Sequence, residues 1–314
     1  MGHFVLTADS AHARDLDTSL NLIEKYRCFG DETNEEILID ASDNGDLNVV
    51  RQLINSGVDV NVYSGRALQR ACYSNRLEVV DFLLQKGADV HFDDDAAVRI
   101  ASPKGGLQMV RLLLDYGANI RAKDDEALML ASAEGDLELV CFLLDNGADV
   151  HATYDDALCK ACRKGHLTVV ELLLERGANV NSCDALNDAS AEGHLEVVSL
   201  LIRKGAKISR HALRWASYYG KIEVARFLLV HGANVNADDD EALRSLMRSP
   251  DWIFRHSLEL VHLLLEYGAN ANANNNEAIE RAEKRITVNP SVLPLLVEYS
   301  NMPMAKRHRK VAVF

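Results

Sequence analysis

Two short motifs in the sequence have a residue spacing that can do chemistry. Cys159 and Cys162 form a C-x-x-C, a spacing used for zinc binding and for thiol–disulfide exchange. His194-Leu195-Glu196 has the H-x-E spacing of zinc deaminases, in which the glutamate transfers protons. Those enzymes also need a downstream P-C-x-x-C, whereas the only C-x-x-C here lies upstream and has no proline. We therefore predict no catalytic residue at either motif.

The cysteine pair also fits a pattern that recurs through the chain. Cys159 falls in a variable column of the pattern, and no second cysteine pair lies nearby to complete a zinc site. We interpret both cysteines as packing residues and predict no metal and no cofactor. Cys162 shares a column of small residues with Cys72, Ser102, Ser132, Ser190 and Ser217.

Charge and composition exclude several further classes of protein. The formal net charge of −13 repels a phosphate backbone, so we expect no nucleic-acid partner. No apolar run approaches the roughly 18 residues of a membrane helix, and the six cysteines form no dense framework. The P-loop, H-E-x-x-H and G-x-S-x-G motifs are absent. We expect a monomeric cytoplasmic protein with reduced cysteines that is not an enzyme and binds neither membranes nor small-molecule substrates.

A glycine followed by a small, a polar and usually a β-branched residue recurs along the chain. The intervals between successive glycines are 30, 30, 30, 30, 28, 27 and 36 residues. An apolar residue precedes the glycine by 19 residues in seven repeats and by 25 residues at Leu243. The connecting segment, from the glycine to the next apolar residue, varies between 8 and 11 residues. The glycines are Gly57, Gly87, Gly117, Gly147, Gly177, Gly205, Gly232 and Gly268.

The constant part of each repeat predicts two helices. The first has a leucine or valine, an alanine three residues later, a small neighbour, and in most repeats a glycine suited to a left-handed helix end. The second has an apolar stripe, as in Leu167–Leu174, that is too wide for one partner and must be covered by stacking. The expected terminal glycines are Gly105, Gly135, Gly165, Gly193 and Gly220.

Acidic residues cluster just before the first helix of several repeats. We predict that Asp95, Asp125, Asp155 and Asp240 cap these helices. Capping explains one acid per repeat but not three, so a negative ridge that steers a basic partner remains an equal alternative. The clusters are Asp93-Asp94-Asp95, Asp124-Asp125-Glu126, Asp155-Asp156 and Asp238-Asp239-Asp240-Glu241.

These motifs resemble the ankyrin repeat. Gly193–Val198 reads G-H-L-E-V-V, and Gly165-His166-Leu167 repeats its start. The resemblance implies an all-α ankyrin-repeat solenoid of about nine helix-turn-helix pairs over residues 35–300, in which His166 and His194 are structural. It also implies a protein-interaction scaffold that binds a partner protein on the concave face of the repeats.

The sequence departs from the family pattern in two ways. Family repeats have about 33 residues, whereas these mostly have 30, and alanine replaces the proline of T-P-L-H. The missing residues fall in the hairpin finger, so we expect shortened fingers and a shallower groove. Such repeats are similar to those of giant amoeba-infecting DNA viruses, which implies a viral protein acting on host factors. The alternatives are a ubiquitin-ligase-type adaptor, which the 14 residues after Ser300 disfavour, and a structural particle component.

Both ends and one insertion carry further predictions. Residues 1–34 form an N-terminal cap through a helix with Leu16, Leu20 and Ile23, and residues 301–314 form a disordered basic tail. The tail run Lys306–Lys310 is interpreted as a solubilising end rather than a nuclear import signal. We expect the insertion Ser249–Phe254 to be buried rather than an exposed docking loop.

Partner-binding residues are carried over from the family's contact positions. We centre the site on repeats four to six, where short connecting segments after Gly177 and Gly205 leave the first helices accessible, and where Arg163, Lys164, Trp215, Tyr218 and Tyr219 offer large contact areas. The alternative is that surface aromatics are ordinary. The complete set is Tyr63, Tyr73, Phe92, Tyr154, Arg163, Lys164, Trp215, Tyr218 and Tyr219.

Overall fold

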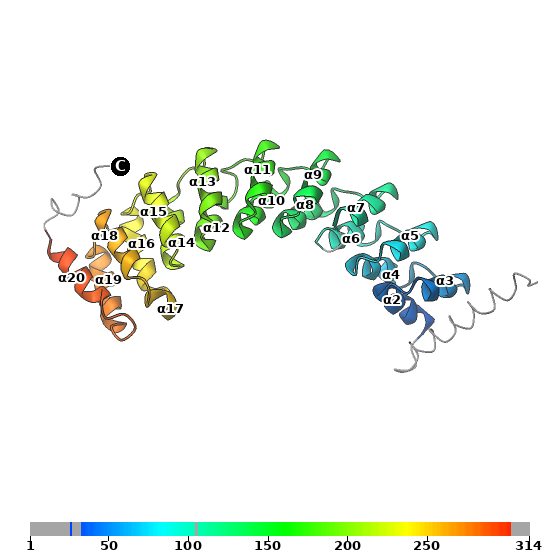
Figure 1. Cartoon of the computed structure of the whole chain (residues 1–314), viewed down its shortest axis with the longest axis horizontal. Helices are drawn as coiled ribbons and strands as arrows, with labels where there is room; N and C mark the ends of the chain where they lie inside the picture. Colours follow the sequence, from blue (N-terminus) through cyan, green and yellow to red (C-terminus); the bar gives the residue numbers. More distant parts are fainter. Residues whose placement is uncertain (1–25, 27–32, 104–105, 303–314) are drawn as a thin grey trace, which may run out of the picture. The chain divides into compact units, whose positions relative to one another are not determined.

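The computed structural model describes residues 26, 33–103 and 106–302. This part of the chain forms 19 helices and no strand (Figure 1). None of the described helices is long and apolar enough to cross a membrane. The predicted cap helix with Leu16, Leu20 and Ile23 lies outside the described residues, as do Gly105 and the basic run Lys306–Lys310.

Nine helix pairs follow one another along the described chain, which confirms the predicted number. The first helices of the pairs are α2 (Asn34–Asn44), α4 (Val62–Tyr73), α6 (Phe92–Ala101), α8 (Ala122–Glu134), α10 (Ala152–Lys164), α12 (Ala185–Glu192), α14 (Arg210–Tyr218), α16 (Ala237–Met247) and α19 (Ala273–Lys284). The second helices are α3 (Leu47–Asn55), α5 (Leu77–Gln85), α7 (Gly106–Asp115), α9 (Leu137–Asp145), α11 (Leu167–Glu175), α13 (Leu195–Arg203), α15 (Ile222–Val230), α18 (Leu258–Glu266) and α20 (Val292–Asn301). The short helix α17 (Asp251–Phe254) lies between α16 and α18.

The chain divides into two compact units. The first comprises Met1–Ala131 and Asp136–Asp149, and the second comprises Ser132–Gly135 and Val150–Phe314. In the first unit α2, α4 and α6 pack in series, as do α3, α5, α7 and α9. In the second unit the series are α10, α12, α14, α16, α19 and α11, α13, α15, α18, α20. Each unit therefore has one layer of first helices and one layer of second helices (Figure 1).

Small residues let neighbouring first helices approach closely. Ala71 and Cys72 are fully buried, as are Ala161 and Cys162. Three serines of this column, Ser42, Ser102 and Ser190, each donate to the carbonyl four residues earlier at 2.6–2.8 Å, whereas the buried hydroxyls of Ser132 and Ser217 have no hydrogen-bond partner among the described residues. The predicted small-residue column is confirmed by its burial.

The glycines predicted to end the first helices are confirmed where the structure describes them. Gly135, Gly165, Gly193 and Gly220 have φ between 67° and 87°, a region that favours glycine. A Cβ on Gly165 would lie 2.5 Å from Nδ1 of His194, so the absence of a side chain makes room for the histidine of the next repeat. Nε2 of His194 lies 3.0 Å from the carbonyl oxygen of Arg163. This confirms that His194 is structural.

A turn of three consecutive left-handed residues lies within the first four residues of the first helix in six repeats, ahead of its regular α-helical part. Their φ angles lie between 48° and 69°. Asp, Asn or Gly occupies 13 of these 18 positions, and these are the residues that tolerate this conformation best. Backbone conformation thus explains the acid clusters, and the left-handed turn takes the place of the family's hairpin finger. The turns are Tyr63–Gly65, Asp93–Asp95, Lys123–Asp125, Thr153–Asp155, Asp238–Asp240 and Asn274–Asn276.

The third aspartate of four turns is buried and joins one repeat to the next. Its Oδ1 accepts a hydrogen bond from the backbone N–H of the polar residue that follows the next repeat's Gly-Ala. The prediction that these aspartates cap their own helices is therefore wrong, because the carboxylate is directed to the neighbouring repeat. The pairs are Asp95 with Asn119 (2.8 Å), Asp125 with Asp149 (2.9 Å), Asp155 with Asn179 (3.0 Å) and Asp240 with Asn270 (2.8 Å).

One pair of cysteines departs from the sequence prediction. Cys159 and Cys183 form a disulfide with a Cα–Cα distance of 6.3 Å, which ties α10 to the segment before α12. The interpretation of Cys159 as a packing residue with a reduced thiol is therefore wrong, because its column faces the next repeat's connecting segment. For Cys162 packing is confirmed, since its thiol is free and buried. Among the described residues, no cluster of histidine, cysteine and acidic side chains is able to hold a metal ion.

The insertion between α16 and α18 is buried only in part. Phe254 is fully buried, and the guanidinium of Arg285 lies 4.1 Å from its ring centroid. Ile253 is also buried, whereas Trp252 is 71% exposed. The prediction of a buried turn is confirmed for Phe254 and wrong for Trp252, because a four-residue helix has a single inward side.

We predict that the buried aspartate bond stabilises the stack. Asp95→Ala leaves the backbone N–H of Asn119 without its acceptor, which should cost about 1–3 kcal/mol of unfolding free energy. Asp94→Ala serves as the control, because Asp94 is an exposed member of the same left-handed turn. This substitution removes only the tolerance of aspartate for a positive φ angle. Asp95→Asn keeps the acceptor oxygen and should be the mildest change at this position. Equal denaturation midpoints for Asp95→Ala and Asp94→Ala would contradict the assignment.

We predict that the disulfide protects Cys159 and Cys183 from alkylation. When the protein is unfolded without reductant and alkylated, Cys159 and Cys183 should stay unlabelled and should appear as one cross-linked peptide by mass spectrometry. Reduction should lower the melting temperature, because a bridge closing a 24-residue separation contributes about 3 kcal/mol. Cys183→Ser should make Cys159 available to alkylation without any reductant. Full labelling of Cys159 in the unreduced wild-type protein would exclude the bridge.

Candidate functional site

The predicted binding residues fall into two groups, one in each unit. In the first unit Tyr63, Tyr73 and Phe92 line one groove. In the second unit three rings form what we call the aromatic cluster, made of Trp215, Tyr218 and Tyr219. The remaining three predicted residues, Tyr154, Arg163 and Lys164, belong to neither group.

The rings of the aromatic cluster contact one another in defined orientations. Trp215 and Tyr219 stack with 6.0 Å between centroids and 24° between planes. Tyr218 lies edge-on to both, at 5.0 Å from Tyr219 and 6.2 Å from Trp215. The guanidinium of Arg214 lies 4.4 Å from the Trp215 ring centroid, a cation–π contact. Tyr219 is 42% exposed, while Trp215 and Tyr218 are half-buried.

Helical spacing places these rings together on the outer side of α14. Residues three and four positions apart share a helix face, so Trp215 lies beside Tyr218 and Tyr219. The opposite face, with Leu213, Ala216 and Ser217, is buried.

The connecting segment before α14 has 8 residues and makes no left-handed turn. Instead, Ser209 is the N-cap residue of α14, and its hydroxyl accepts a hydrogen bond from the backbone N–H of His211 at 3.2 Å.

Trp252 is an exposed aromatic residue in the insertion that we expected to be buried. Its neighbour Ile253 packs against the end of α14, since a Cβ on Gly220 would lie 2.8 Å from Ile253 Cγ2. Gly220 directly follows Tyr219, so α17 adjoins the C-terminal end of the helix that carries the aromatic cluster. The signal in the sequence was the run of three large apolar residues, Trp252 to Phe254, which a single short helix turn cannot bury completely.

The basic residues predicted for this site are differently engaged. Nη2 of Arg163 lies 2.8 Å from Oδ2 of Asp188, so this guanidinium bridges α10 and α12. Lys164 is exposed at the end of α10. Tyr154 is 83% exposed within a left-handed turn. Because α12 packs between α10 and α14, the structure does not bring Arg163 and Lys164 into the aromatic cluster.

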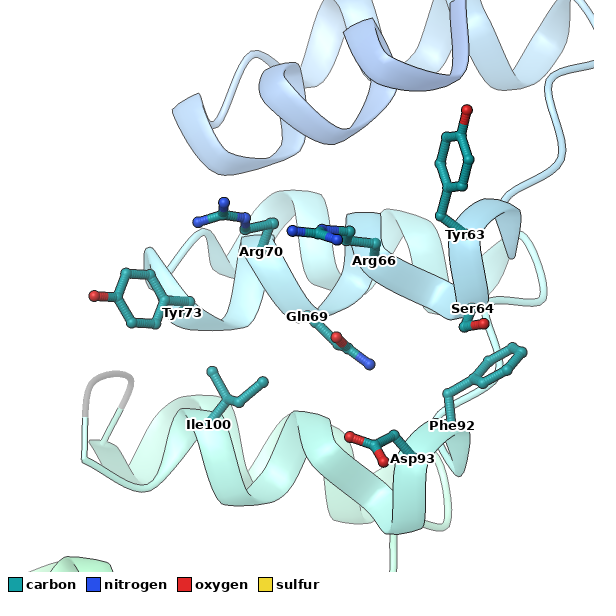
Figure 2. Close-up of a pocket in the computed structure, with 9 residues that line it drawn as sticks. All are labelled: Tyr63, Ser64, Arg66, Gln69, Arg70, Tyr73, Phe92, Asp93 and Ile100. Carbon is teal, nitrogen blue, oxygen red and sulfur yellow. The ribbon is translucent and has the colours of Figure 1, made fainter.

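The first unit has a groove along α4. It has a volume of about 620 Å³ and adjoins a second hollow of about 460 Å³ toward α2. Tyr63, Arg66 and Arg70 line both hollows, and Figure 2 shows the arginines side by side between Tyr63 and Tyr73. The other residues of the larger hollow are Ser64, Gln69, Tyr73, Phe92, Asp93 and Ile100.

Arg66 and Arg70 were not predicted, because the family's contact positions lie in the fingers and five and six residues after the leucine of the first helix, and neither arginine was carried over from them. Their signal is the spacing of residues 66, 70 and 73, which corresponds to one face of a helix.

The described free thiols that are buried are not activated for chemistry. Burial raises the pKa of Cys72 to about 12 and also raises the pKa of Cys162. A reactive cysteine needs the opposite shift, toward a stable thiolate. These two cysteines therefore act as small apolar residues.

Comparison with known proteins gives the same fold. The family model described as "Ankyrin repeats (3 copies)" matches residues 10–94, 93–154, 128–212 and 158–239, which together cover more than half of the chain. The chain is similar to the crystal structure of the human ASB11 ankyrin repeat domain, with 26% identity and a TM-score of 0.57, over 63% of this chain and 98% of that one. A search of curated proteins finds no significant match. The chain therefore belongs to the ankyrin-repeat family, and its fold is an all-α ankyrin-repeat solenoid.

Proposed function

We propose that this chain is a non-enzymatic scaffold that binds a partner protein through the aromatic cluster on α14. The observation that carries the proposal is the mutual stacking of Trp215, Tyr218 and Tyr219 on the solvent side of a helix whose other side already fills the core. Ankyrin repeats are general protein-interaction modules, and this cluster is the largest aromatic grouping in the described chain.

The fold does not require these rings. The columns of Tyr218 and Tyr219 hold Ala191 and Glu192 in the preceding repeat. The first helix of that repeat, α12, still packs against both α10 and α14. Tryptophan, tyrosine and arginine are the residues that most often anchor protein interfaces. Rings that already hold one another in place lose little conformational entropy on binding, which favours affinity.

The identity of the partner is part of the proposal. The 30-residue repeat period resembles ankyrin families of giant amoeba-infecting DNA viruses. We propose on that basis that the partner is a host protein that the chain meets in the host cytoplasm.

We predict that Tyr218→Ala with Tyr219→Ala removes partner binding without unfolding the protein. Anchor residues of this kind contribute about 2 kcal/mol or more each, so recovery of the partner should fall by at least about tenfold. The change in unfolding free energy should be small, because neither ring is fully buried. The measurements are quantitative affinity recovery from source cells, then the Kd of the recovered partner with purified wild-type and variant chains.

Glu192→Ala is the matched control, since Glu192 occupies the column of Tyr219 one repeat earlier. It should bind like the wild type. A large drop in melting temperature of the double variant would show that the rings belong to the core, and an unchanged Kd would show that the partner binds elsewhere.

A further inference from the structure

Two arginines on α4 have no ion-pair partner among the described residues. Arg66 and Arg70 are both exposed and lie on one helix face. The chain has a net charge of −13, and many of its other arginines are paired with carboxylates. Two unpaired guanidiniums side by side on such a surface are a concentrated positive site. The paired arginines include Arg99, Arg121, Arg163, Arg244, Arg248 and Arg281.

Tyrosine rings border this positive site at both ends. Tyr63 is 57% exposed and Tyr73 is 52% exposed. At the Tyr63 end of the site, the ring of Phe92 packs on Gly65. A Cβ at Gly65 would lie only 3.1 Å from this ring. Figure 2 shows the four side chains in one row along α4, with Phe92 below Tyr63. Together they form a groove with aromatic ends and two central cations.

We propose that the α4 groove binds an extended, acidic segment of a partner protein, with carboxylates at alternate positions held by Arg66 and Arg70. This site lies in the first unit and goes beyond the proposed function, because it uses none of the residues of the aromatic cluster.

The helix and an extended peptide have matching periods. Four residues of α-helix separate Arg66 from Arg70 by about 6 Å along the helix axis. Alternate side chains of an extended peptide point the same way and are about 6.8 Å apart. Acidic residues at positions i and i+2 of the peptide can therefore meet both guanidiniums. Each guanidinium can donate two parallel N–H···O bonds to a carboxylate.

Acidic residues also line the groove, but most are already engaged. Glu36 accepts a hydrogen bond from the backbone N–H of Thr33 at 2.9 Å. Asp93 pairs with Arg99 at 3.4 Å. Asp40 on α2 makes no hydrogen bond or ion pair with a described residue and faces the same hollow as the arginines. Glu36 and Asp40 lie only in the smaller hollow, whereas Asp93, the one acid of the larger hollow, is already paired with Arg99. Arg66 and Arg70 therefore leave the larger hollow positive, so a ligand with two carboxylates is favoured there over a neutral one.

The overall charge favours a peptide over a nucleic acid as the source of the anionic groups. A peptide of a few residues fits within the two adjoining hollows of about 620 and 460 Å³ and meets only the local positive charge. A nucleic acid would extend along a surface whose net charge is −13.

Selection from a random peptide library on the purified full chain tests the proposal. The wild type should enrich peptides with Asp or Glu two positions apart, and Arg66→Gln with Arg70→Gln should abolish that enrichment. The best selected peptide should bind the double variant at least about tenfold more weakly, and its affinity should fall as salt is raised. Because both arginines are exposed, the variant should keep the wild-type melting temperature and helical circular dichroism.

Three controls make the outcome specific. Arg203→Gln with Lys204→Gln changes the net charge equally at exposed positions of the second unit and should leave peptide affinity unchanged. Asp40→Asn should tighten binding of the acidic peptide and not of its Gln-substituted form. Tyr218→Ala with Tyr219→Ala should not affect this peptide, so failure here and failure of the aromatic cluster are distinguishable. Absence of acidic enrichment, equal binding by the arginine variant, or displacement by an oligonucleotide at equal concentration would overturn the proposal.

Discussion

One recurring hydrogen bond connects most repeats to the next, and much of the structure follows from it. The backbone N–H of the polar residue after Gly-Ala donates to a side-chain oxygen of the preceding repeat, as Asn119 does to Asp95. Where the buried aspartate is missing, an asparagine supplies the oxygen: Asn61 accepts from the N–H of Asp89 and Asn181 from that of Lys207. The donor is constant while the acceptor changes, so this backbone N–H keeps a hydrogen bond to the preceding repeat with either an aspartate or an asparagine.

The left-handed turn that presents this acceptor also shapes the composition of the chain. Its first two residues are exposed in the Asp93–Asp95 and Asp238–Asp240 turns, and the backbone carbonyls of Asp94 and Asp239 accept hydrogen bonds from Arg99 and Arg244. Aspartate and asparagine are favoured there because they tolerate positive φ. Part of the net negative charge is therefore a consequence of backbone geometry, and an acidic ridge needs no partner to explain it.

The proposed binding surfaces lie on the half of the first helices that is not used in stacking. The inward face holds mostly alanine, serine, cysteine and aliphatic residues, whereas the outward columns vary more. In the second unit those columns hold the aromatic cluster, and in the first unit they hold Arg66 and Arg70 between two tyrosines. The columns of Tyr63, Tyr73, Phe92, Tyr218 and Tyr219 can be assigned from the sequence, and a binding role for these residues stays a prediction. The two arginines were not assigned, because neither lies at a contact position carried over from the family.

The sequence by itself determined the nine helix pairs, the glycines that end the first helices and the structural role of His166 and His194. These features depend on spacing within one repeat, and the repetition of each column makes the spacing visible. Only the tertiary structure decided that Cys159 pairs with Cys183 and that Trp252 is exposed. It also decided that Arg163 forms an ion pair with Asp188, whereas Arg66 has no ion-pair partner among the described residues. These outcomes depend on how side chains of neighbouring repeats meet. Contacts between residues 24 or more positions apart depend on how neighbouring repeats pack, and the residue pattern within a single repeat does not show this.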